Sequence, residues 1–233
     1  GDPVNLADFI AQQEGLPVAK VAKKLRWLLL GYLFRERKVV KGPDVRPRSW
    51  LFDRILAEPT VQREIEATAA REGRSRNAIE KRARKVLDKL GADFRWGAIM
   101  FLRSVIDVVA KRIYAGVDFE PEDAERIRSA ARRGTVVLTP SHRSHFDYLL
   151  VSWLMFWHGV MPPHIAAGNN LSFFPMGPIF RRAGAFFIRR SFQGDPLYAV
   201  LVDRYIRALI VEGYTQEFFL EGGRSRTGKM LPP

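Results

Sequence analysis

The sequence predicts an α/β fold in which a helical N-terminal domain, residues 1–116, precedes a mostly parallel-sheet α/β core, residues 117–233. Two observations support this prediction. Before Gly116, apolar residues recur at helical spacing and no strand-like alternation occurs. After Gly116, short apolar runs alternate with helical patterns, and strands joined by helices form mainly parallel sheets.

Three long helical patterns make up the first part. One follows Pro17, a residue favoured at the first helical position, and its apolar residues recur from Val18 to Leu33. The second covers Ser75 to Leu90, where an apolar stripe lies opposite a basic face and Gly91 is the stop signal. The third runs from Phe94 to Tyr114. These patterns predict a helical bundle.

The second part begins with a predicted helix from Pro121 to Arg133. Four strands are then expected, at Thr135 to Leu138, His164 to Ala167, Ala185 to Ile188 and Glu217 to Leu220. The helix before the last strand opens at Asp195-Pro196 and ends by Gly213. Parallel sheets bind their ligands at the carboxyl ends of the strands, so polar residues that follow these strands are candidates for a site.

Composition excludes several protein classes. The chain has 233 residues, 47% of them hydrophobic, with 38 Lys+Arg against 25 Asp+Glu and a formal net charge of +13. This composition supplies a substantial core and excludes intrinsic disorder. The absence of cysteine excludes disulfides, thiolate metal sites and a cysteine nucleophile. The apolar run from Trp27 to Phe34 is far shorter than the ~20 residues that cross a bilayer, so we expect a soluble or peripheral cytoplasmic protein.

One long segment carries no charge. The 33 residues from Tyr148 to Phe180 contain no Asp, Glu, Lys or Arg, although 27% of the whole chain is charged. Such a segment either packs in the core or meets an apolar partner. Both interpretations stay open at this point.

The first polar cluster, Ser141 to Asp147, follows the strand that ends at Leu138. In one continuous helix His142 and Asp147 would lie about 140° apart and could not pair. A loop followed by a helix brings them together, with Ser144 as the helix cap and Asp147 in the first turn. An imidazole held by a carboxylate is a general base. In the alternative interpretation Asp147 only caps the helix. A zinc site is disfavoured because the sequence has no cysteine and no HExxH pattern.

Two further clusters follow later strands. Arg189 and Arg190 end the apolar run that starts at Gly184, and paired guanidinium groups suit a phosphate or carboxylate, unless they are ordinary surface residues. The run from Phe218 to Lys229 ends in the letters GRSRTGK, which match a P-loop except that Met230 replaces the magnesium-binding Ser or Thr. We therefore reject a nucleotidase and keep phosphate binding by backbone N–H groups and Arg224.

Together the three clusters resemble the motifs of the glycerolipid-synthesis acyltransferase family. HRSHFD resembles the HxxxxD motif, GAFFIRR the second motif and FLEGGRSR the third. The segment from Ala166 to Phe192 is most similar to the large bacterial membrane-bound glycerol-3-phosphate 1-O-acyltransferases. That family has a fourth, proline-containing motif, so we expect an α/β acyltransferase core that is incomplete at the C-terminus and inactive by itself.

The resemblance implies a reaction and a role for each matching residue. His142, oriented by Asp147, would deprotonate the sn-1 hydroxyl of glycerol 3-phosphate, which attacks the thioester of acyl-CoA or acyl-carrier protein to give lysophosphatidic acid without an acyl-enzyme. No cofactor and no metal are implied. Residues implied in substrate binding are Arg143, Ser144, Arg189, Arg190, Glu221, Gly222, Arg224 and Ser225.

The resemblance also implies a location in the cell, and two alternative functions stay open. The uncharged segment would line an acyl groove, and the basic surface would meet anionic phospholipids at the cytoplasmic face of the bacterial inner membrane. A sibling enzyme acting on dihydroxyacetone phosphate or a lysophospholipid is one alternative. A basic nucleic-acid-binding helical module is the other, but it leaves the three ordered motifs unexplained, so we expect no nucleic-acid partner.

Overall fold

The protein is described here by a computed structural model, which covers residues 40, 42–113, 119–142, 144, 146–221 and 229. The chain divides into two compact units, Gly1–Val40 and Lys41–Pro233, and every element below belongs to the second. The predicted helix from Val18 to Leu33 lies outside the described residues. The expected domain boundary at residue 116 also falls outside them and stays a prediction.

A parallel four-stranded sheet is at the centre of the second unit. Its strands are β1 (Val137–Leu138), β2 (His164–Gly168), β3 (Ala185–Ile188) and β4 (Gln216–Glu217), in the order β1-β4-β2-β3. All three strand pairs are parallel, which confirms the predicted α/β architecture. The bounds of two strands differ from the prediction. Strand β1 begins at Val137 instead of Thr135, and β4 begins one residue early, at Gln216, and ends at Glu217 instead of Leu220, because the pairing of β1 with β4 covers only two residues of each.

Helices connect the strands, as the alternating pattern predicts. These are α8 (Asp147–Trp157), α9 (Met176–Arg182) and α10 (Pro196–Val211), with a short 3₁₀ turn η1 (Asn169–Leu171) before α9. Asp195 caps α10 by accepting a hydrogen bond from the N–H of Tyr198 at 3.1 Å. Gly184, between α9 and β3, has a φ of +107° and lies against the backbone of Pro163, a place where a side chain would be strained.

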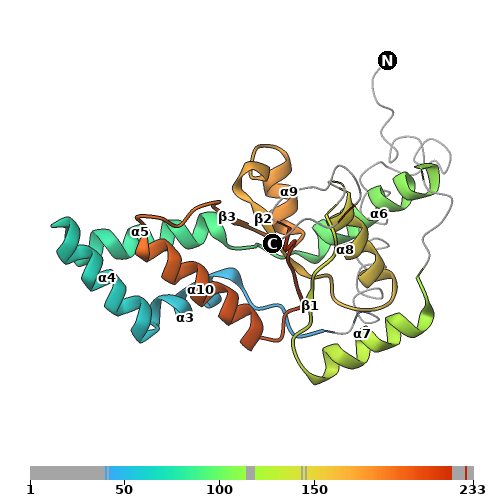
Figure 1. Cartoon of the computed structure of the whole chain (residues 1–233), viewed down its shortest axis with the longest axis horizontal. Helices are drawn as coiled ribbons and strands as arrows, with labels where there is room; N and C mark the ends of the chain where they lie inside the picture. The colour runs from blue at the N-terminus through green and yellow to red at the C-terminus, as the bar shows by residue number, and fades with distance from the viewer. Residues whose placement is uncertain are drawn as a thin grey trace, which may run out of the picture. The chain divides into compact units, whose positions relative to one another are not determined.

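Five helices precede β1 in the described chain. They are α3 (Arg48–Ala57), α4 (Pro59–Glu72), α5 (Arg76–Leu90), α6 (Trp96–Ile113) and α7 (Pro121–Arg133). Helix α5 has nearly the bounds that the sequence predicts, and the Ser75 hydroxyl caps it by accepting the N–H of Ala78 at 3.3 Å. Helices α3 and α4 were not predicted. Helices α3, α4 and α5 lie beside α10 in Figure 1 and pack on it.

The two faces of the sheet are covered by different helices. On one face the fully buried Tyr205 of α10 contacts the rings of Phe186 from β3 and Phe52 from α3. On the other face Tyr148 of α8 and Phe180 of α9 form an apolar cluster with alternate strand residues, namely Ile165, Ala185 and Phe187. The loops at the carboxyl ends of the strands open onto this second face, where the predicted site lies.

Candidate functional site

The histidine and the aspartate of the first cluster meet at the end of β1. His142 lies in the loop after the strand and Asp147 is the first residue of α8. The His142 Nδ1 atom is 3.5 Å from Asp147 Oδ2, and both side chains are largely shielded from solvent. Because Nδ1 faces the carboxylate, Nε2 is the ring nitrogen on the side away from Asp147.

The predicted role of Ser144 as the cap of the helix is wrong. We expected it to cap the helix, but α8 begins at Asp147 and Phe146 occupies the cap position without a side-chain bond. The Asp147 carboxylate instead accepts the backbone N–H of Ser144 at 2.7 Å and its hydroxyl at 2.8 Å. The N–H of Phe146 donates to the Ser144 hydroxyl at 3.0 Å. Asp147 therefore both faces His142 and holds the loop in shape.

The chain after β4 fixes His142 from the opposite side. Glu221 is buried and accepts the backbone N–H of His142 at 3.1 Å. The ring of Phe219 lies 4.3 Å from the imidazole, measured between ring centroids. The first and third motifs, 79 residues apart in sequence, thus meet at one edge of the sheet.

The two arginines after β3 have different surroundings. The Arg189 guanidinium is 2.9 Å from Asp195 and stacks over the ring of Tyr198 at 4.1 Å. Asp195 also pairs with Arg82 at 3.1 Å. Arg190 is exposed, and no hydrogen bond or ion pair to its side chain is found within the described part of the chain. Of the pair, Arg190 is the guanidinium that is open to an anion.

A cavity of about 600 Å³ joins these groups, a size that suits a small-molecule site. His142, Ser152, Arg189 and Arg190 are among its polar lining residues. Its apolar wall comes from α8, α9, β2 and the chain after β4, and includes Tyr148, Leu149, Ile165, Leu171, Phe180 and Phe219. The cavity therefore combines a histidine that faces a carboxylate, two arginines and an apolar wall.

Four predicted substrate-binding residues cannot be placed. Arg143, Gly222, Arg224 and Ser225 lie outside the described residues, as does most of the glycine-rich loop.

In the described ranges no group of three or more His, Asp or Glu side chains could hold a metal ion. His164 stacks between Phe94 and Tyr214 in the core, where burial lowers its pKa to about 4.

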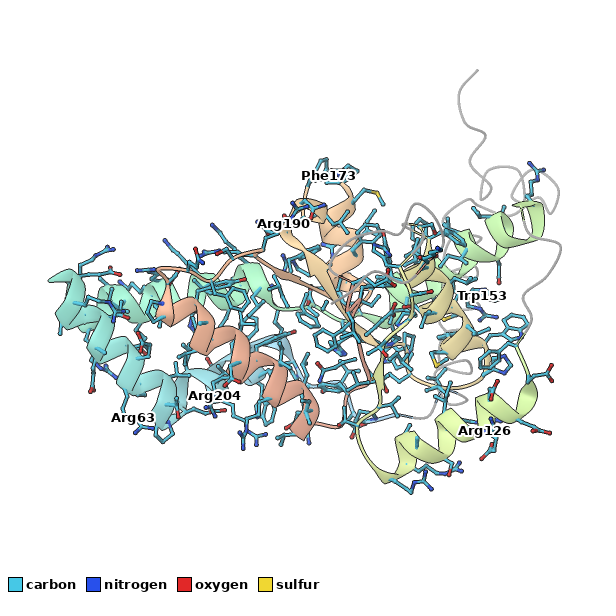
Figure 2. The ribbon with its side chains drawn as sticks, in the orientation of Figure 1. Arg63, Arg126, Trp153, Phe173, Arg190 and Arg204 are labelled. Atoms are coloured by element: carbon cyan, nitrogen blue, oxygen red, sulfur yellow. The ribbon has the colours of Figure 1, made fainter. Side chains whose placement is uncertain are left out.

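The segment before α9 exposes two adjacent aromatic side chains. Phe173 is 56% exposed and Phe174 is 86% exposed. Figure 2 shows Phe173 and Arg190 both at the upper edge of the view, near α9. Part of the uncharged segment is therefore core, since Met155 and Phe156 are buried, whereas these two phenylalanines are exposed to solvent. Contact with an apolar partner stays a prediction. No helix in the ranges covered by the structure is both long and apolar enough to cross a bilayer.

Sequence reasoning did not single out Glu217 as a functional residue. It is fully buried on β4, and burial, reinforced by the charge of Asp147, raises its pKa to about 8. The sequence contains a pattern that points to Glu217. It stands two residues before Phe219 and four before Glu221, and alternate residues of an extended chain lie on one face. A buried acid at the end of a strand, two and four residues before two residues that contact His142, lies next to the same site.

Comparison with known proteins gives consistent matches. Residues 119–233 match the family model described as Acyltransferase. A protein of Aeromonas hydrophila named glycerol-3-phosphate acyltransferase is 42% identical over 214 residues, which are 91% of this chain and 26% of that protein. Proteins of the same name from Haemophilus ducreyi and Shewanella halifaxensis are 39% and 38% identical, over 91% and 97% of this chain. The chain spans 26 to 28% of the length of these relatives.

Proposed function

Because this chain belongs to the acyltransferase family, we propose that it carries the catalytic pair of an enzyme that acylates the sn-1 hydroxyl of glycerol 3-phosphate. The acyl donor is a thioester of coenzyme A or of acyl-carrier protein, and the product is lysophosphatidic acid. The observation that carries the proposal is that His142, whose Nδ1 faces Asp147, lines the same cavity as Arg190.

The proposed step is direct acyl transfer. His142 Nε2 removes the proton of the sn-1 hydroxyl while the hydroxyl oxygen attacks the thioester carbonyl carbon. The tetrahedral intermediate collapses, the C–S bond breaks, and the imidazolium returns its proton to the thiolate. Asp147 orients the imidazole and stabilises its protonated form during the step. Residues 1–233 contain no cysteine, and this mechanism needs none.

The two substrates are assigned to different parts of the cavity. Arg190 binds the phosphate, and Arg189 adds positive charge although Asp195 already engages its guanidinium. Glu221 keeps the loop of His142 in place through the backbone N–H. The apolar wall around Leu149 and Phe180 accommodates the start of the acyl chain.

The exposed aromatic residues favour attachment to a membrane surface. Phe173 and Phe174 enter the headgroup region of a bilayer, and neighbouring arginines bind its anionic lipids. We propose that the protein is peripheral at the cytoplasmic face of the bacterial inner membrane, where a long-chain lipid product is released. This attachment would place the mouth of the cavity next to the lipid.

The test uses the full gene product, including any chain beyond residues 1–233. Radiolabelled glycerol 3-phosphate and a long-chain acyl-CoA or acyl-carrier protein are supplied, and lysophosphatidic acid is scored. We expect His142→Ala and Asp147→Ala each to lower kcat at least about 10²-fold, since a positioned base contributes about 10² to 10⁴. His158→Gln is the matched control, because His158 follows the last residue of α8 and its ring contacts Phe119, at the opposite end of the helix from Asp147.

Three results would contradict the proposal. Unchanged turnover in His142→Ala would refute the base mechanism. Faster acylation of dihydroxyacetone phosphate or a lysophospholipid than of glycerol 3-phosphate would indicate a sibling enzyme. A salt-sensitive shift of DNA or RNA without any acyl transfer would favour the nucleic-acid-binding alternative.

A further inference from the structure

Glu217 is a buried acid that the proposed mechanism does not use. It is the last residue of β4, its exposed fraction is 0%, and neither carboxyl oxygen has a hydrogen-bond partner within the described residues. A buried polar group without a partner destabilises a fold and is uncommon. Its presence at this position therefore needs a physical reason.

The register of the sheet places Glu217 on the face of the catalytic pair. Glu217 pairs with Leu138 of β1 and Ile165 of β2, and Ile165 belongs to the apolar cluster beneath α8. Two and four residues further on, Phe219 contacts the His142 ring and Glu221 binds the His142 backbone. Glu217 is thus the innermost of three alternate residues on this face.

The surroundings of Glu217 favour its protonated form. Leu138 and Ile165, its neighbours on both adjacent strands, are apolar. Among the described residues, the charged or titratable groups on this side of the sheet include Asp147 and Tyr148 from α8, and His142 and Glu221 on the flanking loops. Arg189 and Arg190 line the same cavity as His142 and Tyr148. The charge of Asp147 acts on Glu217 in the same direction as burial, and both disfavour ionisation.

Of the two carboxyls, Glu217 and Asp147, Asp147 is the one whose hydrogen bonds stabilise the ionised form. Asp147 accepts two hydrogen bonds from Ser144, and such donors stabilise the charged form of a carboxyl. Glu217 has no comparable donor among the described residues. When two interacting carboxyls titrate as a coupled pair, the proton goes to the one that is less well solvated, here the fully buried Glu217 and not the partly exposed Asp147.

We propose that Glu217 is a positioning residue that holds a proton beneath Asp147, so that the pair presents a single negative charge to His142. This inference rests on the proposed function. When Glu217 loses its proton at alkaline pH, a second negative charge is buried next to Asp147. This second charge competes with Asp147 for the proton of His142 and disturbs the alignment of the imidazole with Asp147, so kcat falls.

The first test compares pH profiles in the full gene product. We expect wild-type kcat to fall as the pH rises through about 8, while Glu217→Gln, which is neutral at every pH, keeps its kcat there. At pH 7 the two proteins should agree within about 3-fold, and their KM values for glycerol 3-phosphate should be the same. Gln216→Met is the matched control, because Gln216 is equally buried on the same strand but faces the other side of the sheet. It should keep the wild-type alkaline fall.

The second test reads the proton directly in the wild type, so it holds even if a variant does not fold. Infrared difference spectra between pH 6.5 and 9.5 should contain the carbonyl stretch of a protonated carboxyl that disappears near pH 8. A wild type without this band, or parallel pH profiles for wild type and Glu217→Gln in an active enzyme, would overturn the role of Glu217 alone. Absence of any acyl transfer at every pH would overturn the proposed function, and with it this role.

Discussion

Arg190→Ala is expected mainly to raise the KM for glycerol 3-phosphate. Arg190 follows β3 at the rim of the cavity that His142 also lines. A phosphate held alike in the ground state and the transition state affects KM more than kcat. A hydrogen bond to a charged group contributes about 1.5 to 3 kcal/mol, which corresponds to roughly 10- to 150-fold. Because Arg190 is exposed and water screens it, we expect the lower part, about 10- to 30-fold.

The assay measures both KM values in detergent, where the membrane does not contribute. The KM for the acyl thioester should change less than the KM for glycerol 3-phosphate. Arg190→Lys should recover only part of the loss, since an ammonium group lacks the planar fork of a guanidinium. Arg182→Ala, which removes another exposed arginine from the end of α9, is the control and should leave both values unchanged.

The same measurement separates the two arginines of the motif. Arg189→Ala should raise the glycerol 3-phosphate KM less than Arg190→Ala, because Asp195 and the Tyr198 ring already hold its guanidinium. An unchanged KM in Arg190→Ala, together with weaker binding to anionic vesicles, would refute the phosphate role and make Arg190 a membrane-facing charge.

Three further outcomes are expected. Asp195→Ala should lower the unfolding free energy by about 1 to 3 kcal/mol, because it removes the cap of α10 and two partly exposed ion pairs. Burial raises the pKa of Asp195, but hydrogen bonds and the neighbouring arginines lower it by more. The difference in unfolding free energy between wild type and Asp195→Ala in urea should therefore narrow as the pH falls below about 4. Replacing Phe173 and Phe174 by Ser should weaken sedimentation with anionic vesicles and leave turnover in detergent within about 2-fold; equal vesicle binding would exclude this surface. The folded state binds the Glu217 proton more tightly than the unfolded state, so the unfolding free energy of the wild type should fall by up to about 1.4 kcal/mol per pH unit between pH 4.5 and 8. Glu217→Gln should lack this contribution to the fall. Equal slopes of unfolding free energy against pH for the two proteins, measured in urea, would count against a buried neutral acid.

Local sequence patterns determined the elements and the edge at which the site lies. Strands β2 and β3 and helices α5, α7 and α10 are found within a residue or two of their predicted bounds, because periodicity, caps and glycine stops act over a few residues. Parallel pairing follows from strands that alternate with helices. That alternation also places the ends of β1, β3 and β4 together, and with them His142, Arg190 and Glu221.

Tertiary structure decided what each of these residues contacts. The side chain of Asp195 holds Arg189 and leaves Arg190 open, although the two arginines are adjacent and identical in type. Ser144 bonds to Asp147 within the loop instead of capping α8. Glu217 becomes a buried acid beside the pair because β4 lies between β1 and β2, a strand order that no local pattern encodes. Burial and charge pairing depend on groups brought together from distant parts of the chain, and desolvation, hydrogen bonding and pKa take their values only once that packing exists.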